Sequence, residues 1–204
     1  MSSTSSTIIE ECETICDTGL AQMAYFYFDF RDKAKKDVRG LLTSLLSQLS
    51  AKSDVCYKIL SELYSRHHAG SRQPVDDALK QCLIDMLQVP GQPATYIILD
   101  ALDECPNTDV VSPRDEVLKL VEELINLSLP ALRLCITSRR EADIIPALQP
   151  LASHPMSLHD QNGQKEDISF YVKSVVNSDR RARRWRVEDK ELVIDTLVRK
   201  AGGM

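Results

Sequence analysis

The chain has 204 residues, enough for one domain, or for one domain and the start of a second. Its 43% apolar and 27% charged residues are ordinary for a soluble globular protein, and its net charge of −5 gives no general attraction to nucleic acids or anionic membranes. The net charge therefore argues against a protein that binds nucleic acids or anionic membrane surfaces.

The cysteines and the first residues bear on the cellular compartment. The six cysteines include no Cys-x-x-Cys pair and several lie in apolar segments, so a reduced intracellular protein is favoured over a disulfide framework. Residues 1–7 are mostly Ser and Thr, unlike a signal peptide. No uncharged apolar stretch approaches the about 18 residues that a membrane span needs. We therefore expect a soluble, cytoplasmic protein.

The first half of the chain predicts one strand among helices. Residues 5–17 repeat apolar side chains at helical spacing, and Gly19 ends this helix. Residues 21–30 hold five of the ten Phe and Tyr residues and no breaker, which predicts a buried strand. Amphipathic patterns then predict helices over residues 37–49, 54–66 and 75–88.

The second half predicts two more buried strands. The breaker at residues 90–93 (Pro-Gly-Gln-Pro) precedes the apolar run 95–100, and a second such run occupies 131–137. Between them, residues 113–127 have the apolar stripe of a helix that begins with Pro113. The remaining patterns predict a short helix near 141–148, a weak strand at 156–158, and helices over about 164–177 and 188–200. Strands that alternate with helices and are apolar on both faces indicate an α/β protein with a parallel sheet between two helical layers.

The most specific motif is the segment 96–105, Tyr-Ile-Ile-Leu-Asp-Ala-Leu-Asp-Glu-Cys. Its hydrophobic residues carry Asp100 to the carboxyl end of a strand, where open α/β sheets bind ligands. Asp103 and Glu104 follow, and three acids this close repel one another unless they share a cation or one stays protonated. Mg²⁺, which takes one or two carboxylates with phosphate oxygens and water, is the expected partner. The alternative is a strand that ends in a solvated acidic turn.

A second motif follows the strand predicted over 131–137. Ser138 and Arg139 come directly after it, and in a parallel sheet they would lie at the same edge as Asp100. A polar side chain and a permanent cation there could detect a γ-phosphate or its loss. The alternative is an arginine that begins the next helix. The two motifs, one helix apart, are more specific together than either is alone.

Five arginines and Trp185 are concentrated in residues 180–186. Basic and aromatic runs of this kind can bind phosphate backbones or act as import signals. We favour a solvated linker between two helices, with Trp185 packed inward and the arginines near Glu188 and Asp189, because the net charge of the chain is acidic. We accordingly expect no nucleic-acid partner and no membrane partner.

Taken together, the motifs resemble the NACHT branch of the STAND NTPases, in particular the fungal NACHT proteins whose domain is also called nephrocystin-3-like N-terminal. Segment 96–105 is similar to the family's extended Walker B motif, and residues 132–140 (Leu-Arg-Leu-Cys-Ile-Thr-Ser-Arg-Arg) are similar to its sensor-1 strand. Residues 24–32, followed by a leucine-rich helix, are similar to the stretch between Walker A and Walker B. The resemblance covers essentially the whole chain.

The resemblance implies a fold and a set of roles. The fold is a three-layer, parallel-sheet P-loop NTPase of the ASCE type. Asp100 would orient Mg²⁺ and its water, and Asp103 and Glu104 would polarise the attacking water. Arg139, with Ser138 beside it, would sense the γ-phosphate of ATP.

The chain departs from the family at its beginning. The P-loop, G-x-x-x-x-G-K-[ST], is expected just before the helix at 5–17, but the 204 residues do not contain it. Sliding the pattern along the chain places Met1 at the lysine and Ser2 at the hydroxyl that binds Mg²⁺, with no preceding glycine. We therefore expect a fragment, a truncated gene model or a degenerate paralogue, cut before or within the Walker A loop and lacking the first, P-loop strand.

The expected domains are a partial NACHT nucleotide-binding core in residues 1–162 and the start of a helical lid in residues 163–204. ASCE sheets have the strand order 5-1-4-3-2. The strands near 22–30, 95–100 and 131–137 should therefore form a contiguous three-stranded parallel sheet, with the last strand at an edge or paired irregularly with 156–158.

The resemblance also implies a function. Intact relatives are thought to be switches, in which ATP binding opens the protein for self-association or protein partners and slow hydrolysis resets it. Two hypotheses remain for this chain: an NTPase switch, and a nucleotide-free remnant that acts in protein–protein interaction. The absent P-loop favours the second for this polypeptide alone.

Overall fold

Strands and helices alternate in the computed structural model, which describes residues 3–67, 72–107, 112–156, 162–179 and 181–201. The chain divides into two units, Met1–Ala152 and Ser153–Met204. The strands of the described residues all lie in the first unit: β1 (Ala21–Tyr27), β2 (Ala94–Asp100) and β3 (Leu132–Ile136).

The three strands form one parallel sheet in the order β1-β2-β3. Tyr27 pairs with Asp100, and Leu99 pairs with Ile136, so the carboxyl ends of all three strands meet at one edge. The predicted contiguous parallel sheet is therefore confirmed, with β3 at one side of it. Parallel neighbours need a crossover connection, and the helical segments between the strands provide it.

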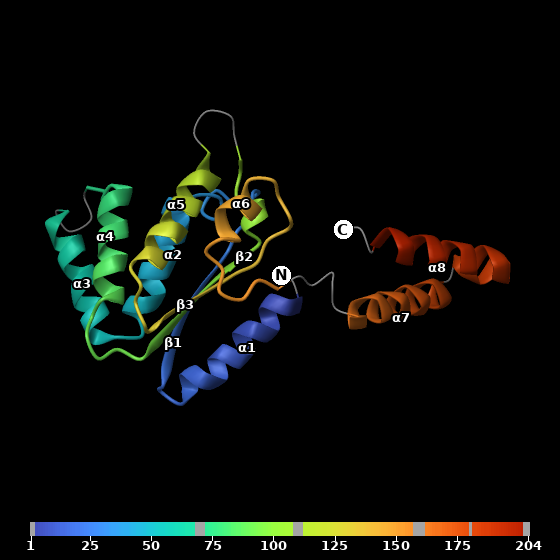
Figure 1. The fold of residues 1–204 in the computed structure, drawn as a ribbon, viewed down its shortest axis with the longest axis horizontal. Helices are drawn as coiled ribbons and strands as arrows, with labels where there is room; N and C mark the ends of the chain where they lie inside the picture. The colour runs from blue at the N-terminus through green and yellow to red at the C-terminus, as the bar shows by residue number, and fades with distance from the viewer. Residues whose placement is uncertain (1–2, 68–71, 108–111, 157–161, 180, 202–204) are drawn as a thin grey trace. The chain divides into compact units, whose positions relative to one another are not determined.

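Helices cover both faces of this sheet (Figure 1). The helices of the first unit lie close to their predicted positions: α1 (Ser3–Asp17), α2 (Val38–Ser50), α3 (Asp54–Arg66), α4 (Asp76–Leu87), α5 (Pro113–Asn126) and the short α6 (Ile144–Leu148). Side-chain caps begin three of them, because Asp37, Ser53 and Ser112 each accept a hydrogen bond from a backbone N–H in the first turn of α2, α3 and α5. The predicted three-layer α/β fold is thus present.

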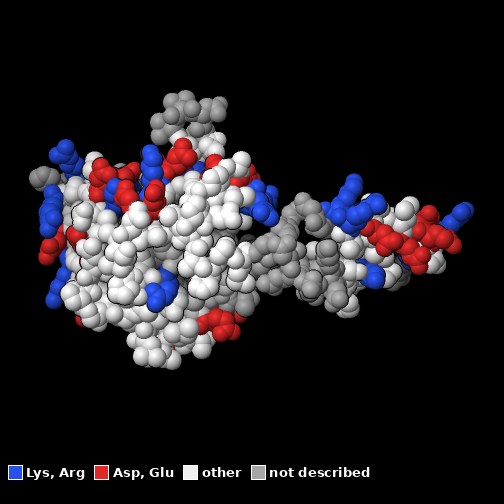
Figure 2. All heavy atoms as spheres, viewed as in Figure 1, with Lys and Arg blue, Asp and Glu red and all other residues white. Residues whose placement is uncertain are grey.

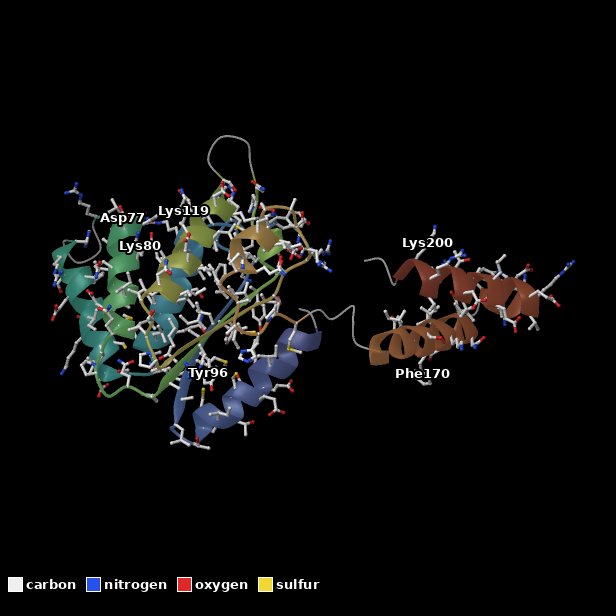
Figure 3. The ribbon with its side chains drawn as sticks, viewed as in Figure 1. Asp77, Lys80, Tyr96, Lys119, Phe170 and Lys200 are labelled. Atoms are coloured by element: carbon white, nitrogen blue, oxygen red, sulfur yellow. The ribbon has the colours of Figure 1, made fainter. Side chains whose placement is uncertain are left out.

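The two faces of the sheet belong to two separate apolar clusters. The larger cluster joins Phe26 and Leu99 to α2, α4 and α5, and contains buried leucines throughout α2. The smaller cluster joins Met23 and Ile98 to Ile9 of α1, with Tyr96 packed against it (Figure 3). Period-two alternation along each strand therefore places both faces in contact with helices, as expected for a buried parallel sheet.

Charged side chains gather at the end of the first unit where α4 and α5 begin (Figure 2). Asp77 and Lys80 of α4 and Lys119 of α5 lie there (Figure 3). Lys80 Nζ is 3.0 Å from Glu123 Oε2 and so joins α4 to α5. Because α5 follows β2 in the chain, this is the end toward which the carboxyl ends of the strands point.

A tight contact shapes the loop that follows β1. A Cβ atom added to Gly40 would lie 2.0 Å from the carbonyl oxygen of Ala34, so only glycine lets the loop pack this closely against α2. The predicted strand at 21–30 was too long, because β1 ends at Tyr27. Asp29 starts a turn in which its backbone N–H donates to the Lys35 carbonyl at 3.0 Å, and Phe30 becomes 63% exposed.

The outer edge of β1 is paired by a side chain. The Tyr25 N–H donates to Gln48 Oε1 at 3.0 Å, and Gln48 Nε2 donates to the Tyr25 carbonyl at 2.7 Å. The amide of Gln48 on α2 thus replaces the two hydrogen bonds that a neighbouring strand would make with this residue. Such coverage protects an edge strand from pairing with another chain.

The second unit contains α7 (Asn162–Ser178) and α8 (Val187–Ala201), whose Val176 and Ile194 share one buried cluster with Ala182 of the segment between the helices. Part of the basic run, Ala182–Arg184, forms a 3₁₀ turn between the two helices, as expected of a linker; Arg180 lies outside the described residues. The expected inward packing of Trp185 was wrong, since this residue is 45% exposed. Of the strand expected at 156–158, Met156 has no regular structure, and residues 157–158 lie outside the described residues.

Candidate functional site

Asp100 is the last residue of the central strand β2 and is only 4% exposed. The hydroxyl of Thr137 donates to Asp100 Oδ1 at 2.5 Å. The same Thr137 oxygen accepts a hydrogen bond from the Ala101 N–H at 3.0 Å. Burial raises the pKa of the Cys135 thiol, and the nearby negative charge of Asp100 adds to that shift. A carboxylate is thus held in a fixed orientation at the carboxyl end of the sheet.

The chain turns sharply after Asp100. Ala101 adopts a left-handed conformation, with φ of 56° and ψ of 48°, and the 3₁₀ turn η1 (Leu102–Glu104) follows. Leu102 is fully buried, and its N–H donates to the Thr137 carbonyl at 3.0 Å. We call residues 101–105 the acidic turn. The buried leucine anchors it, so Asp103 and Glu104 are presented at the edge of the sheet.

Asp103 and Arg139 contact each other directly. Asp103 Oδ1 accepts a hydrogen bond from the backbone N–H of Arg139 at 3.0 Å, and its Oδ2 lies 3.4 Å from Arg139 Nε. The side chain of Asp103 is 11% exposed, whereas that of Arg139 is 83% exposed. The sequence motifs that predicted Asp100, Asp103 and Arg139 at one edge of the sheet therefore do come together there.

Of the other predicted site residues, Glu104 and Ser138 take no part in the contact between Asp103 and Arg139 that is described above. Glu104 is half-buried and lies in the same turn. Ser138 is exposed, and its hydroxyl donates to the carbonyl of Arg139 at 2.8 Å, so it faces its own backbone in this structure. Ser2 lies outside the described residues.

An open cavity of about 330 Å³ adjoins the acidic turn. It is lined by residues of the turn, of the loop after β1, of α5 and of the segment after β3: Phe30, Asp103, Glu104, Cys105, Pro106, Arg114, Arg139 and Glu141. Four separate segments of the chain therefore meet around one cavity. Acidic and basic side chains both face it, and Phe30 adds an exposed aromatic ring.

The loop after β1 carries an ion pair beside this cavity. Arg31 donates from Nε and Nη2 to the two carboxylate oxygens of Asp29, both at 2.9 Å. These hydrogen bonds, together with one from the Arg31 backbone, lower the pKa of Asp29 to about 2. Arg31 also lies over the Phe30 ring, 5.8 Å from its centre. The loop conformation is thus fixed by a bidentate pair.

Sequence reasoning missed two residues of the site. Thr137, which orients Asp100, was treated as the last residue of a strand; its hydroxyl beside the Ser-Arg pair was the available signal. Arg114 lies in the helix predicted over 113–127 but was not singled out, although it is only 7% exposed and lines the cavity. Its position directly after Pro113, the first residue of α5, was the only signal in the sequence.

The residues at this edge are compatible with Mg²⁺. The described residues contain no group of three or more His, Cys, Asp or Glu side chains arranged to hold a metal ion by themselves. Mg²⁺ does not need such a group, because it is usually bound through one or two carboxylates, with phosphate oxygens and water as its other ligands. A single oriented carboxylate at Asp100 fits that requirement.

Comparison with known proteins identifies the family. The sequence model described as Nephrocystin 3, N-terminal matches residues 2–139, a region that runs from the first helix through the sheet to Arg139. No curated protein and no solved structure matches the chain significantly. The matched region contains the acidic turn, Thr137 and Arg139, and it is well over half of the chain. The chain therefore belongs to the nephrocystin 3 N-terminal family.

Proposed function

We propose that this chain carries the Mg²⁺- and water-handling half of a nucleotide site in a NACHT-type STAND NTPase resembling the fungal proteins of that class. The single observation that supports this most is the convergence of Asp100, the acidic turn and Arg139 at the carboxyl edge of a parallel sheet. Open α/β proteins bind ligands at that edge. A solvated acidic turn alone does not account for a buried Asp100 held by Thr137.

In this proposal each residue has a separate task. Asp100 holds Mg²⁺, which when bound would offset the charge of the ATP phosphates. Glu104, half-buried beside the cavity, polarises the attacking water. Arg139 senses the γ-phosphate, and the Ser138 hydroxyl lies next to it. Asp103 acts mainly by holding Arg139, since both of its carboxylate oxygens face that residue.

A second candidate is a nucleotide-free module that binds protein partners or its own copies. The observation in its favour is that the 204 residues contain no G-x-x-x-x-G-K-[ST] motif. In P-loop NTPases that loop supplies a cradle of backbone N–H groups and a lysine for the phosphates. For both candidates we propose a cytoplasmic protein whose partners are proteins, with neither nucleic acid nor membrane as a ligand.

Amide NMR spectra recorded during a titration with Mg²⁺, and then with millimolar ATP, distinguish the two candidates. The first predicts Mg²⁺-dependent shifts at Asp100 and Glu104 that disappear in Asp100→Asn. This variant keeps an oxygen that can accept from Thr137. Asp77→Asn, which changes an exposed aspartate on α4, is the matched control and should respond like the unmodified protein. A protein whose spectrum does not change at these residues would favour the interaction module.

A further inference from the structure

Arg114 is the second residue of α5 and is only 7% exposed, which is rare for an arginine. Its Nη2 donates to the Asp103 carbonyl at 2.6 Å, and its Nε donates to the Cys105 carbonyl at 2.9 Å. Its Nη1 lies 3.2 and 3.1 Å from the two carboxylate oxygens of Asp143. We call this set of contacts the Arg114 clasp.

The clasp connects the two halves of the site. The two carbonyls that it binds belong to the residues on either side of Glu104, so the main chain is fixed both before and after this glutamate. Asp143, at the start of α6, follows Arg139 by four residues. It is itself held by Asn107 Nδ2 at 2.9 Å. One guanidinium therefore joins α5, the acidic turn and the segment that begins at Arg139.

We infer that Arg114 is a positioning residue, which sets where the Glu104 carboxylate lies in the cavity relative to Arg139. The inference deepens the proposed function and rests on it for what Glu104 does; the geometry of the clasp does not depend on it. Among the described residues, Arg114 donates to backbone carbonyls of the acidic turn and not to the side chains of Asp103 or Glu104, so its effect acts through the backbone of the turn.

The chemistry of the clasp requires arginine rather than any cation. A guanidinium presents its donors in a rigid planar fork, which reaches two carbonyls and a carboxylate at once. A lysine ammonium is a single point and cannot occupy all three directions from one position. If Arg114 only balanced the charge of Asp143, the Arg114→Lys protein would keep the acidic turn as closed as in the unmodified protein. If Arg114 positions the turn, lysine cannot replace it and the turn will open.

Two buried cysteines can report whether the structure opens, one within the acidic turn and one far from it in sequence on α4. Cys105 belongs to the acidic turn, is fully buried and donates its thiol to the Lys36 carbonyl at 3.3 Å, and burial raises its pKa to about 12. Cys82 on α4 is 4% exposed, and burial raises its pKa to about 11. Neither thiol reacts with an alkylating reagent until the structure around it opens.

The test is the rate of iodoacetamide labelling at each cysteine, measured by peptide mass mapping of the native protein. In Arg114→Lys, losing at least one charge-assisted hydrogen bond should open the turn and accelerate labelling of Cys105 by about tenfold or more. Cys82 should stay within about twofold of the unmodified protein, since local opening leaves α4 folded. Arg39→Lys is the matched control: Arg39 also bonds a carboxylate and a carbonyl, those of Asp76 and Pro74, and this variant should leave Cys105 unchanged.

Asp143→Asn provides a second variant that keeps Arg114 and an oxygen acceptor, and it should give a smaller acceleration at Cys105 alone. The inference is overturned if Cys105 in Arg114→Lys labels at the unmodified rate, or if Cys105 and Cys82 accelerate equally, which would mean global destabilisation. A parallel titration with Mg²⁺ alone separates this inference from the proposed function. Absence of any Mg²⁺ response in the unmodified protein would contradict the proposed function, while the labelling ratio still decides the role of Arg114.

Discussion

The carboxylate of Asp103 holds Arg139 at two points, through the backbone N–H at 3.0 Å and through Nε at 3.4 Å. The side chain of Asp103 is nearly buried, whereas the side chain of Arg139 is mostly exposed, so the contact to Nε is an ion pair with an exposed partner. An exposed ion pair contributes little to stability, whereas a backbone N–H that loses its acceptor costs more. In this structure Asp103 therefore fixes the backbone of Arg139, just after the end of β3.

Two substitutions of Asp103 separate these contacts. Asp103→Asn keeps an oxygen for the Arg139 N–H and should lower the free energy of unfolding by less than about 1 kcal/mol. Asp103→Ala removes the acceptor as well and should cost about 1–2 kcal/mol. Urea denaturation of both proteins measures the difference. Equal stability of the two variants would show that the backbone contact is unimportant.

The Gln48 amide should stabilise the edge strand β1 and protect it from aggregation. Gln48→Ala leaves the N–H and the carbonyl of Tyr25 facing water, so we expect a loss of about 1 kcal/mol and increased aggregation. Urea denaturation and light scattering measure the two effects. Gln81→Ala is the control, because it makes the same change on an exposed face of α4, where Gln81 bonds only Asp85 among the described contacts. Identical behaviour of the two variants would refute the edge role.

Gly40 should tolerate no side chain. In Gly40→Ala the new Cβ would meet a backbone oxygen at 2.0 Å, so the loop over residues 29–36 must move away from α2. Overpacking of this kind costs about 1–3 kcal/mol, and urea denaturation would measure it. Ser47→Ala, at an exposed position of the same helix, should be close to neutral. A stable Gly40→Ala protein would mean that the loop is not packed as described.

The ion pair between Asp29 and Arg31 predicts a response to acid. The pKa of Asp29 in the folded protein is about 2, below its ordinary value of 3.8, chiefly because Arg31 donates hydrogen bonds to it. A lowered pKa means that the pair stabilises the fold above about pH 4, and that this contribution is lost as the pH falls through about 2. Carboxyl NMR titration should give the low pKa in the unmodified protein and a value near 3.8 in Arg31→Ala. Equal values in the two proteins would contradict this explanation.

The positions of the elements could be predicted because they depend on local pattern. The helix expected at 54–66 is observed as Asp54–Arg66, where Ser53 supplies the cap and the apolar spacing continues to the last turn. The apolar runs of β2 and β3 were recognisable because breakers or polar residues flank them. The strand at 21–30 was overextended, because aromatic residues continue past Tyr27 while a turn at Asp29 has already begun.

The parts of the site that escaped prediction depend on tertiary contacts. Thr137 matters because parallel pairing brings the end of β3 beside Asp100, and no local pattern reveals which polar residue will be its partner. Arg114 looks like an ordinary helix arginine until the acidic turn folds over it. Sequence motifs indicated which acids meet at the edge, but they could not reveal which residues hold those acids in place.

The proposed nucleotide site would have its acidic half in this chain and would need a P-loop to bind phosphate. Each phosphate hydrogen bond of such a loop is worth roughly 1.5–3 kcal/mol, so the absence of three weakens binding by about 4–9 kcal/mol. Such a loss converts a micromolar site to a millimolar one or weaker, at about 1.4 kcal/mol per tenfold. The 204-residue chain alone should accordingly bind Mg-ATP only weakly and release no phosphate.

Calorimetry with Mg-ATP tests this most directly, on the chain alone and on a fusion that places the strand and P-loop of a related NTPase ahead of Met1. We predict millimolar or weaker binding by the chain alone, a gain of about a hundredfold or more in the fusion, and loss of that gain in the fusion carrying Asp100→Asn. Micromolar binding by the 204-residue chain alone, or a fusion that binds no better than the chain, would contradict the account.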